Sequence, residues 1–133
     1  RTDSGGAGRQ RGGLGTKKSY RCLDAEFTAS QLTDRHQHQA YGLAGGQPGA
    51  AGMTWYQASG HDGWQTMVEA FDKRSTSKWS NVTFKPGDRV QILTPGGGGY
   101  GMPAERDPAQ LAADLRDGFV SAEAARRDYG RNV

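Results

Sequence analysis

Two histidines and an aspartate alternate in one short stretch and could bind a metal ion together. The three residues are Asp34, His36 and His38. Alternate side chains of a β-strand point to the same face, so in a strand these three would share a face. Carboxylate and imidazole groups are common ligands of divalent metals. The spacing therefore predicts a candidate metal site. The competing interpretation is that all three are ordinary polar side chains, since a spacing of two is also common by chance.

A second pair of residues could carry acid–base chemistry. His61 stands next to Asp62, and an imidazole beside a carboxylate is a familiar proton-transfer arrangement. The pair is followed by Gly63, however, and Asp-Gly is a strong turn signal in β-hairpins. The sequence therefore favours a hairpin tip, and no catalytic residue is predicted from this chain.

A run of glycines could form a phosphate-binding turn. Gly96, Gly98 and Gly101 have the spacing of a dinucleotide-binding turn that follows a strand. Such a turn should open a helix directly, but Met102 and Pro103 intervene, and no Lys-Ser or Lys-Thr ending follows. We therefore expect these glycines to serve close backbone packing, which they permit because they have no side chain. No cofactor-binding residue is predicted.

The residues before this run alternate between apolar and polar types, as strands do. Residues 17–29 are predicted to form a strand with Leu23, Ala25 and Phe27 on one face. Further strands are expected at 53–57 and 65–71, and the clearest hairpin at 81–93, with its turn at Pro86-Gly87-Asp88.

The residues after the run are predicted to form two short helices. Asp107 is a good N-cap and is followed by Pro108, and Gly118 should end this first helix. Ser121 should cap a second helix that ends at Gly130.

Glycine is also concentrated in residues 1–16 and 42–52, which we expect to be extended and similar to polyproline II. The predicted fold class is therefore α+β, mainly antiparallel β with glycine-rich extended segments and a short C-terminal helical hairpin. We expect a single domain, 1–133, with a β and glycine-rich part at 1–101 and a helical tail at 102–133.

Large aliphatic and aromatic core residues are scarce. Leu, Ile, Val and Phe together number 17 of 133 residues, about 13%. Hydrophobic burial scales with apolar area, at roughly 25 cal/mol per Å². We therefore expect the chain to complete its core against something larger, with its glycine segments packed against that larger chain. It would then be a small subunit of an assembly or a piece of a longer polypeptide.

The charge pattern does not predict a nucleic-acid-binding protein. The net charge is only +3, and the basic residues near the start are not interleaved with aromatic residues. One cysteine, Cys22, cannot form an internal disulfide, which suggests a reducing compartment, and we expect a cytoplasmic protein. No run of about 20 apolar residues is present, so no membrane partner is predicted.

Several strings, taken in order, resemble the C-terminal part of the hydantoinase B/oxoprolinase family. The resemblance spans nearly the whole chain, and the joint pattern is specific although each piece alone is not. The strings are Asp3-Ser4-Gly5-Gly6-Ala7-Gly8, Arg11-Gly12-Gly13-Leu14-Gly15, Gly42-Leu43-Ala44-Gly45-Gly46 with Pro48-Gly49, Lys85-Pro86-Gly87-Asp88, Thr94-Pro95-Gly96-Gly97-Gly98-Gly99-Tyr100-Gly101, Glu105-Arg106-Asp107-Pro108, and Gly118-Phe119-Val120-Ser121 through Tyr129-Gly130.

The resemblance implies an ATP-dependent, multi-subunit enzyme. Members of the family hydrolyse cyclic amides or carboxylate ketones, and ATP and Mg are expected on a partner subunit of hydantoinase A type. Metal-binding residues in some members lie upstream of the similar portion, so no family catalytic residue is carried onto this chain. The function expected is the small subunit or split C-terminal portion of a ketone carboxylase of acetophenone or acetone type, supporting larger A-type and B-type subunits. The alternatives are a subunit of a hydantoinase or 5-oxoprolinase and, in another class, a stand-alone module that binds phosphate ligands.

Overall fold

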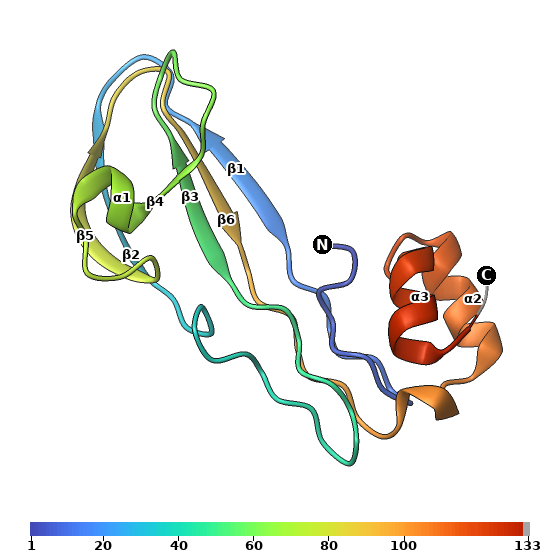
Figure 1. Cartoon of the computed structure of the whole chain (residues 1–133). Helices are drawn as coiled ribbons and strands as arrows, with labels where there is room; N and C mark the ends of the chain where they lie inside the picture. The colour runs from blue at the N-terminus through green and yellow to red at the C-terminus, as the bar shows by residue number, and fades with distance from the viewer. Residues whose placement is uncertain (132–133) are drawn as a thin grey trace.

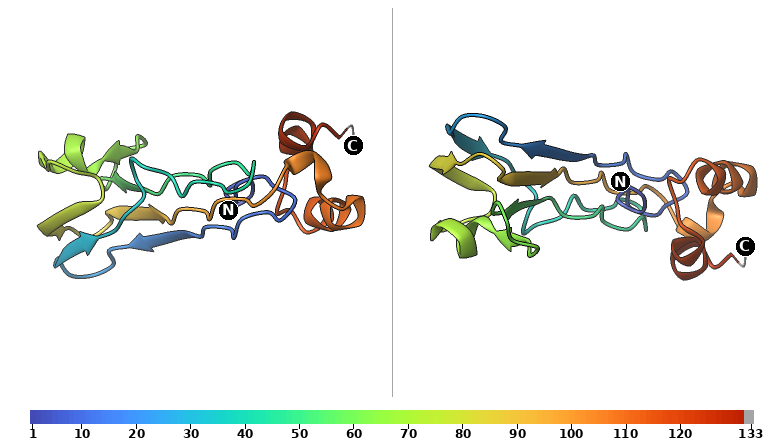
Figure 2. Two further views of the ribbon diagram at one scale, coloured as in Figure 1. Left: turned by 90° about the horizontal axis from the view of Figure 1, so that it is seen from below. Right: turned by 90° about the horizontal axis from the view of Figure 1, so that it is seen from above.

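The computed structural model describes residues 1–131 and shows an elongated molecule (Figures 1 and 2). Two small β-sheets lie at one end and a helical tail lies at the other. Between them, extended glycine-rich segments run side by side. The fold is α+β, as predicted.

The helices and strands are short. In chain order they are β1 (Lys17–Arg21), β2 (Phe27–Leu32), β3 (Met53–Gln57), β4 (Gln65–Thr66), α1 (Met67–Phe71), β5 (Lys78–Phe84), β6 (Arg89–Leu93), η1 (Pro103–Glu105), α2 (Pro108–Arg116) and α3 (Ala122–Tyr129).

The strands form two antiparallel sheets. One sheet has the order β1-β6-β3-β4, and the other contains β2 and β5. Both β1 and β3 pair with the central strand β6, so that Arg89 lies directly opposite Arg21 on one side and Gln57 on the other. The strand β1 is an edge of its sheet, and its two lysines and its arginine are the kind of charged residues that keep an exposed edge from pairing further.

The strand predicted at 17–29 is in fact two strands in different sheets. The chain leaves the first sheet at Cys22, whose N–H donates to the Asp88 carbonyl at 2.9 Å, and it enters the second sheet at Phe27. The segment 78–93 crosses between the sheets at the same place, because the Gly87 N–H donates back to the Cys22 carbonyl at 2.8 Å. Two long segments therefore pair along their length and bend together from one sheet into the other.

The hairpin predicted at 81–93 has the predicted turn but not the predicted pairing. The Asp88 N–H donates to the Lys85 carbonyl at 3.0 Å, which closes the turn. The strands on its two sides do not pair with each other, because β5 pairs with β2 and β6 pairs with β1 and β3.

The prediction of a strand at 65–71 is correct for its first two residues and wrong for the rest. Only Gln65–Thr66 pairs with β3, and the chain then forms helix α1. A capping box explains the change: the Thr66 hydroxyl accepts from the Glu69 N–H at 3.2 Å, and the Glu69 carboxylate accepts from the Thr66 N–H at 2.7 Å.

One hydrophobic cluster lies between the sheets and α1. Phe84 is at its centre, with ring centroids 5.1 to 6.2 Å from those of four other aromatic residues. The buried members of the cluster are Cys22, Tyr56, Met67, Trp79, Val82, Phe84 and Val90.

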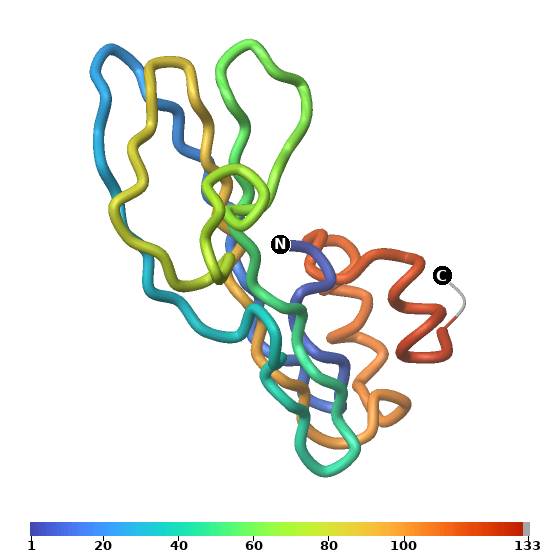
Figure 3. The backbone as a smooth tube through the Cα atoms, turned by 60° about the vertical axis from the view of Figure 1, so that its left-hand side comes forward, coloured from blue at the N-terminus to red at the C-terminus, as the bar shows by residue number. Residues whose placement is uncertain are grey.

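The glycine-rich segments pack on one another through their backbones (Figure 3). Gly6 donates to the Gly97 carbonyl, and Gly99 donates to the carbonyl of Gln47, each at 2.9 Å. A Cβ atom on Gly96 would overlap the Ser4 carbonyl. The expected packing of backbone on backbone is confirmed, but the glycines contact other segments of this same chain. The expectation that they pack against a larger chain is therefore wrong for these contacts.

The helical tail agrees with the sequence. Asp107 caps α2 by accepting from the Ala109 N–H at 2.8 Å, and Ser121 caps α3 by accepting from the Ala124 N–H at 3.0 Å. Gly130 ends α3 with a left-handed φ of 65°. The tail encloses a second buried cluster, Ala7, Leu111, Val120, Ala124, Ala125 and Tyr129. No helix in residues 1–131 has the length and apolar character needed to cross a membrane.

Candidate functional site

The predicted metal ligands lie beside a groove of about 460 Å³ between the end of β2 and the start of β5. Asp34, His36 and His38 all line it, together with Lys78. They do not share the face of a strand as expected, because β2 ends at Leu32 and the chain then turns through Arg35, which has a left-handed φ of 63°.

The side chains of these residues are held by other contacts. The Asp34 carboxylate pairs with Lys78 at 3.2 Å on an exposed surface. The His36 ring lies 3.1 Å from the Thr33 hydroxyl through Nε2 and 3.3 Å from the Thr76 hydroxyl through Nδ1. Burial lowers the pKa of His36, which favours its neutral form.

The geometry does not bring the three residues into a metal site. Within residues 1–131, no three His, Cys, Asp or Glu side chains are grouped so that they could hold a metal ion. Both ring nitrogens of His36 already have hydroxyl neighbours. Metal binding by this groove stays a prediction that the arrangement of its side chains does not support.

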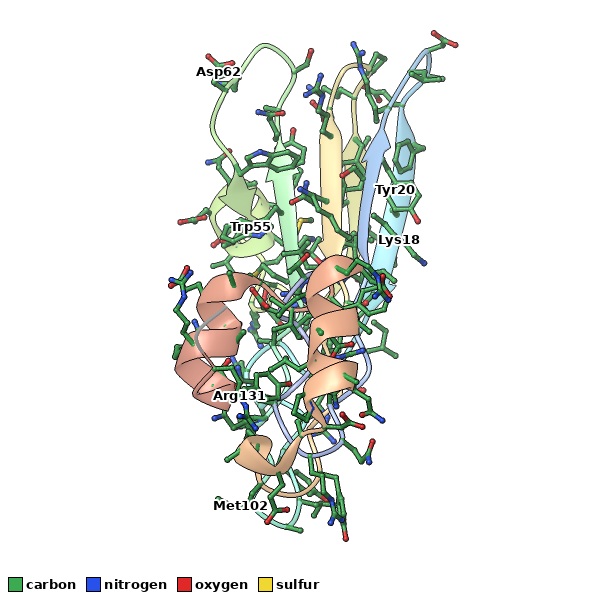
Figure 4. All side chains as sticks on the ribbon, turned by 90° about the vertical axis from the view of Figure 1, so that its right-hand side faces the viewer. Lys18, Tyr20, Trp55, Asp62, Met102 and Arg131 are labelled. Atoms are coloured by element: carbon green, nitrogen blue, oxygen red, sulfur yellow. The ribbon has the colours of Figure 1, made fainter. Side chains whose placement is uncertain are left out.

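His61 and Asp62 lie in the loop between β3 and β4, as the turn interpretation predicts, and Figure 4 shows Asp62 at its outer end. Both residues are exposed and line a polar cavity of about 270 Å³. Arg21 of β1 and Arg89 of β6, two strands of the same sheet as β3 and β4, also line this cavity.

The glycine run after β6 is not free to bind a dinucleotide. The N–H groups of Gly96, Gly97, Gly99 and Gly101 donate at 2.9 to 3.0 Å to carbonyls elsewhere in the chain. A phosphate-binding turn must point such groups at its ligand. The packing interpretation of this run is therefore the one that the structure supports.

A buried ionic cluster joins the glycine segments to the helical tail. Asp114 accepts from Arg106 at 2.6 Å and from the Nε and Nη2 atoms of Arg11 at 3.2 Å each. Arg106 also donates to the carbonyl of Arg9 at 3.2 Å. Asp114 and Arg106 are less than a tenth exposed, so the cluster fixes the tail in one position rather than offering a surface for ligands.

The sequence does not reveal this cluster, because nothing in the pattern distinguishes Arg11 from the other basic residues near the start of the chain. Those basic residues do not form one surface. Arg1 donates to the carbonyls of Ala51 and Thr94, whereas Arg9 lies 5.9 Å from the ring centre of Tyr100. The residue that could have revealed the cluster from the sequence is Asp114. It is a charged residue on the same face of the helix as Leu111 and Leu115.

Apolar side chains are exposed over much of the surface. A groove of about 240 Å³ opens into the first hydrophobic cluster beside Tyr20 and Phe27, which are 53% and 44% exposed. Figure 4 shows Tyr20 at the free edge of the sheet and Met102 at the far end of the molecule. Other large apolar residues with more than half of their surface exposed are Leu23, Leu32, Tyr41 and Leu43. Tyr20 and Phe27 line the same groove, and a contiguous exposed apolar patch of this kind is typical of an interaction site.

Comparison with known proteins decides the family. The model of hydantoinase B/oxoprolinase matches residues 1–103. This chain belongs to the hydantoinase B/oxoprolinase family. Its resemblance to that family in sequence is thereby confirmed, and the match covers most of the chain. The resemblance to the small component of an acetophenone carboxylase is a finer statement that the match does not address.

The relatives of this hydantoinase B/oxoprolinase family member are much longer than it is. It is 37% identical to the uncharacterized protein MJ0963 of Methanocaldococcus jannaschii and 34% identical to the beta subunit of the caprolactamase of Pseudomonas jessenii. Each match covers 97% of this chain but 21% of the relative. The chain therefore spans about a fifth of the length of these curated relatives.

Two solved structures contain a portion with the same fold as this chain. The ATP-dependent caprolactamase from Pseudomonas jessenii matches 99% of this chain and 22% of its own, with a TM-score of 0.77 and 30% identity. The nucleotide-free acetone carboxylase matches 98% of this chain and 20% of its own with a TM-score of 0.72, and at 23% identity this match shows the fold alone.

Proposed function

We propose that this chain forms a supporting portion of the B-type subunit of an ATP-dependent, multi-subunit enzyme. The observation that carries the proposal is the match of nearly the whole chain to about a fifth of one chain of the ATP-dependent caprolactamase. A portion of a larger subunit needs a rigid body of its own and a surface that fits the rest. The glycine segments and the ionic cluster make the chain rigid. The exposed apolar residues offer a surface that could contact the rest of the subunit.

The proposed role is structural or site-completing rather than catalytic. The candidate chemistry of the sequence is either dispersed, as for Asp34 and His38, or used for packing, as for the glycine run. In this proposal, ATP and Mg bind to a partner of hydantoinase A type. The glycine loops do not support the alternative of a stand-alone phosphate-binding module, because their amides bind other parts of the chain.

We favour a cyclic amide as the substrate class of the assembled enzyme. The relatives with the higher identities include the caprolactamase of Pseudomonas jessenii, whose beta subunit is 34% identical, and a putative D-/L-hydantoinase of Pseudomonas sp., whose B-type subunit is 32% identical. A ketone carboxylase is the second candidate, since the acetone carboxylase alpha subunit of Xanthobacter autotrophicus is 27% identical over 98% of this chain.

The test is to isolate the native assembly through a tag on this chain and to measure ATP hydrolysis with each substrate class. Hydantoin, 5-oxoproline and caprolactam represent cyclic amides, and acetone with bicarbonate represents the carboxylase reaction. We expect hydrolysis only by the whole assembly, and only with a cyclic amide. Hydrolysis coupled to acetone would select the second candidate, and ATP hydrolysis by the isolated chain would contradict the proposal.

A further inference from the structure

Two arginines lie directly opposite each other in the first sheet with no acidic partner. Arg21 of β1 pairs in register with Arg89 of β6. Directly opposed side chains in an antiparallel pair share a face, and their Cβ atoms are about 4.5–5.5 Å apart. Like charges in this position destabilise a sheet. Within residues 1–131, neither guanidinium has an ion-pair partner.

The other residues around this pair form a polar cavity rather than a flat surface. Gln57 lies opposite Arg89 on its other side, so three neighbouring strands present a donor at the same level. His61 and the loop between β3 and β4 close the cavity, whose volume is about 270 Å³. Small-molecule sites usually have about 300 Å³ or more, so this cavity suits a small ligand.

We propose that this cavity binds a phosphate group. Two guanidinium groups offer planar forks of N–H donors, which match phosphate oxygens in pairs. A phosphate group has enough oxygens to engage Arg21 and Arg89 together and carries up to two negative charges against their two positive ones. A carboxylate has only two oxygens and one charge, so it would satisfy one fork and leave the other unpaired. The site is separate from the glycine run, whose amides are already used.

Asp62 sets the strength of this site. Its carboxylate lines the same cavity, but no ion pair joins it to either arginine. A nearby negative charge lowers the affinity for an anion, so removing it should strengthen binding. This gives the proposal a variant that gains affinity, which simple damage to the fold would not produce.

The test is a titration of the whole chain with inorganic phosphate. Binding is monitored by NMR, through the signals of the Gly60 and Gly87 amides and of the arginine Nε–H groups. We expect saturable shifts in the millimolar range. R21Q and R89Q should each weaken binding about tenfold or more, and D62N should strengthen it severalfold. Acetate should bind at least several times more weakly than phosphate.

The matched control is K17Q, which removes the same charge from the same strand outside the cavity. It should leave the dissociation constant within twofold of the parent value, and unchanged amide spectra should show that each variant is folded. Equal weakening by K17Q and R89Q would mean that only net charge matters, and it would overturn the proposal. Shifts that do not saturate, or acetate binding as strongly as phosphate, would also overturn it. The outcome is independent of whether the chain assembles with hydantoinase-type subunits.

Discussion

The Cα atom of Gly96 lies against the backbone carbonyl of Ser4, with no room for a side chain between them. Both residues are hydrogen-bonded to the backbone of Ala50. Gly96 donates to the Ala50 carbonyl at 3.0 Å, and Ala50 donates to the Ser4 carbonyl at 2.8 Å. Three segments that are far apart in the sequence therefore meet through bare backbone. This contact explains why a chain with few large apolar residues can hold a defined shape.

Replacing Gly96 with alanine should destabilise the chain severely. The added Cβ would overlap a carbonyl that is fixed by its own hydrogen bond, so the backbone segments must separate. We expect a loss of about 3 kcal/mol or more in the free energy of unfolding, at the upper end of overpacking effects. Urea denaturation followed by circular dichroism measures it. Gly13 is the matched control, because a Cβ there would meet no atom within 4 Å. Equal midpoints for G96A and G13A would contradict the packing described here.

Replacing Asp114 with alanine should release the helical tail. The change leaves Arg106 and Arg11 buried or half-buried without their carboxylate, and breaking a buried pair in this way costs about 3–5 kcal/mol. The control is D117A at the C-cap of the same helix, where the pair with Arg116 is exposed and should contribute less than about 1 kcal/mol. Thermal denaturation distinguishes them, and similar melting temperatures would show that the cluster does not hold the tail.

The stability of the chain should fall at high pH through Tyr56. Its hydroxyl donates to the Asp88 carboxylate at 2.9 Å, and burial together with this contact raises the pKa of Tyr56 to about 12. An unfolded tyrosine has a pKa near 10, so the neutral form is favoured in the folded state. This contribution is complete below about pH 10 and is lost as the pH rises toward about 12.

The Y56F variant isolates this effect. It lacks the ionisable group, so its stability should decline less steeply than that of the parent between about pH 10 and 12. At neutral pH it should be less stable by about 1.5–3 kcal/mol, because a hydrogen bond to a charged group is lost. Parallel pH profiles for the two proteins would exclude Tyr56 as the source.

Cys22 should react slowly with thiol reagents in the folded protein. Its side chain is buried, and its thiol donates to the Ala25 carbonyl at 3.1 Å. Burial raises the pKa of Cys22, and the nearby carboxylate of Asp88 raises it further. The reactive thiolate is therefore scarce at neutral pH. We expect little alkylation in native buffer and one modified thiol per chain in urea. Rapid modification in native buffer would show that this part of the sheet opens easily.

The local parts of the fold could be predicted from the sequence. The caps of α2 and α3 depend on residues next to the helices, such as Asp107 and Ser121, and the structure confirms both. The helix α1 could also have been found, because Thr66 and Glu69 have the spacing of a capping box.

The pairing of strands could not be predicted in the same way. Residues 84 and 89 flank a good turn, yet their strands pair with partners elsewhere in the sequence, and only the three-dimensional packing selects those partners. The ionic cluster could not be predicted either, because it joins Arg11 and Asp114, which are 103 residues apart in the sequence. The backbone packing of glycines was predictable in kind, but not which segments would meet.

The most direct test of the proposed function is to identify what accompanies this chain in its own cells. A tag on the chain, gentle purification and native mass spectrometry would give the identity and stoichiometry of the associated polypeptides. We predict an assembly of fixed composition that contains sequences of both hydantoinase A type and hydantoinase B type. A homogeneous preparation of this chain alone, folded and without such partners, would contradict the proposal.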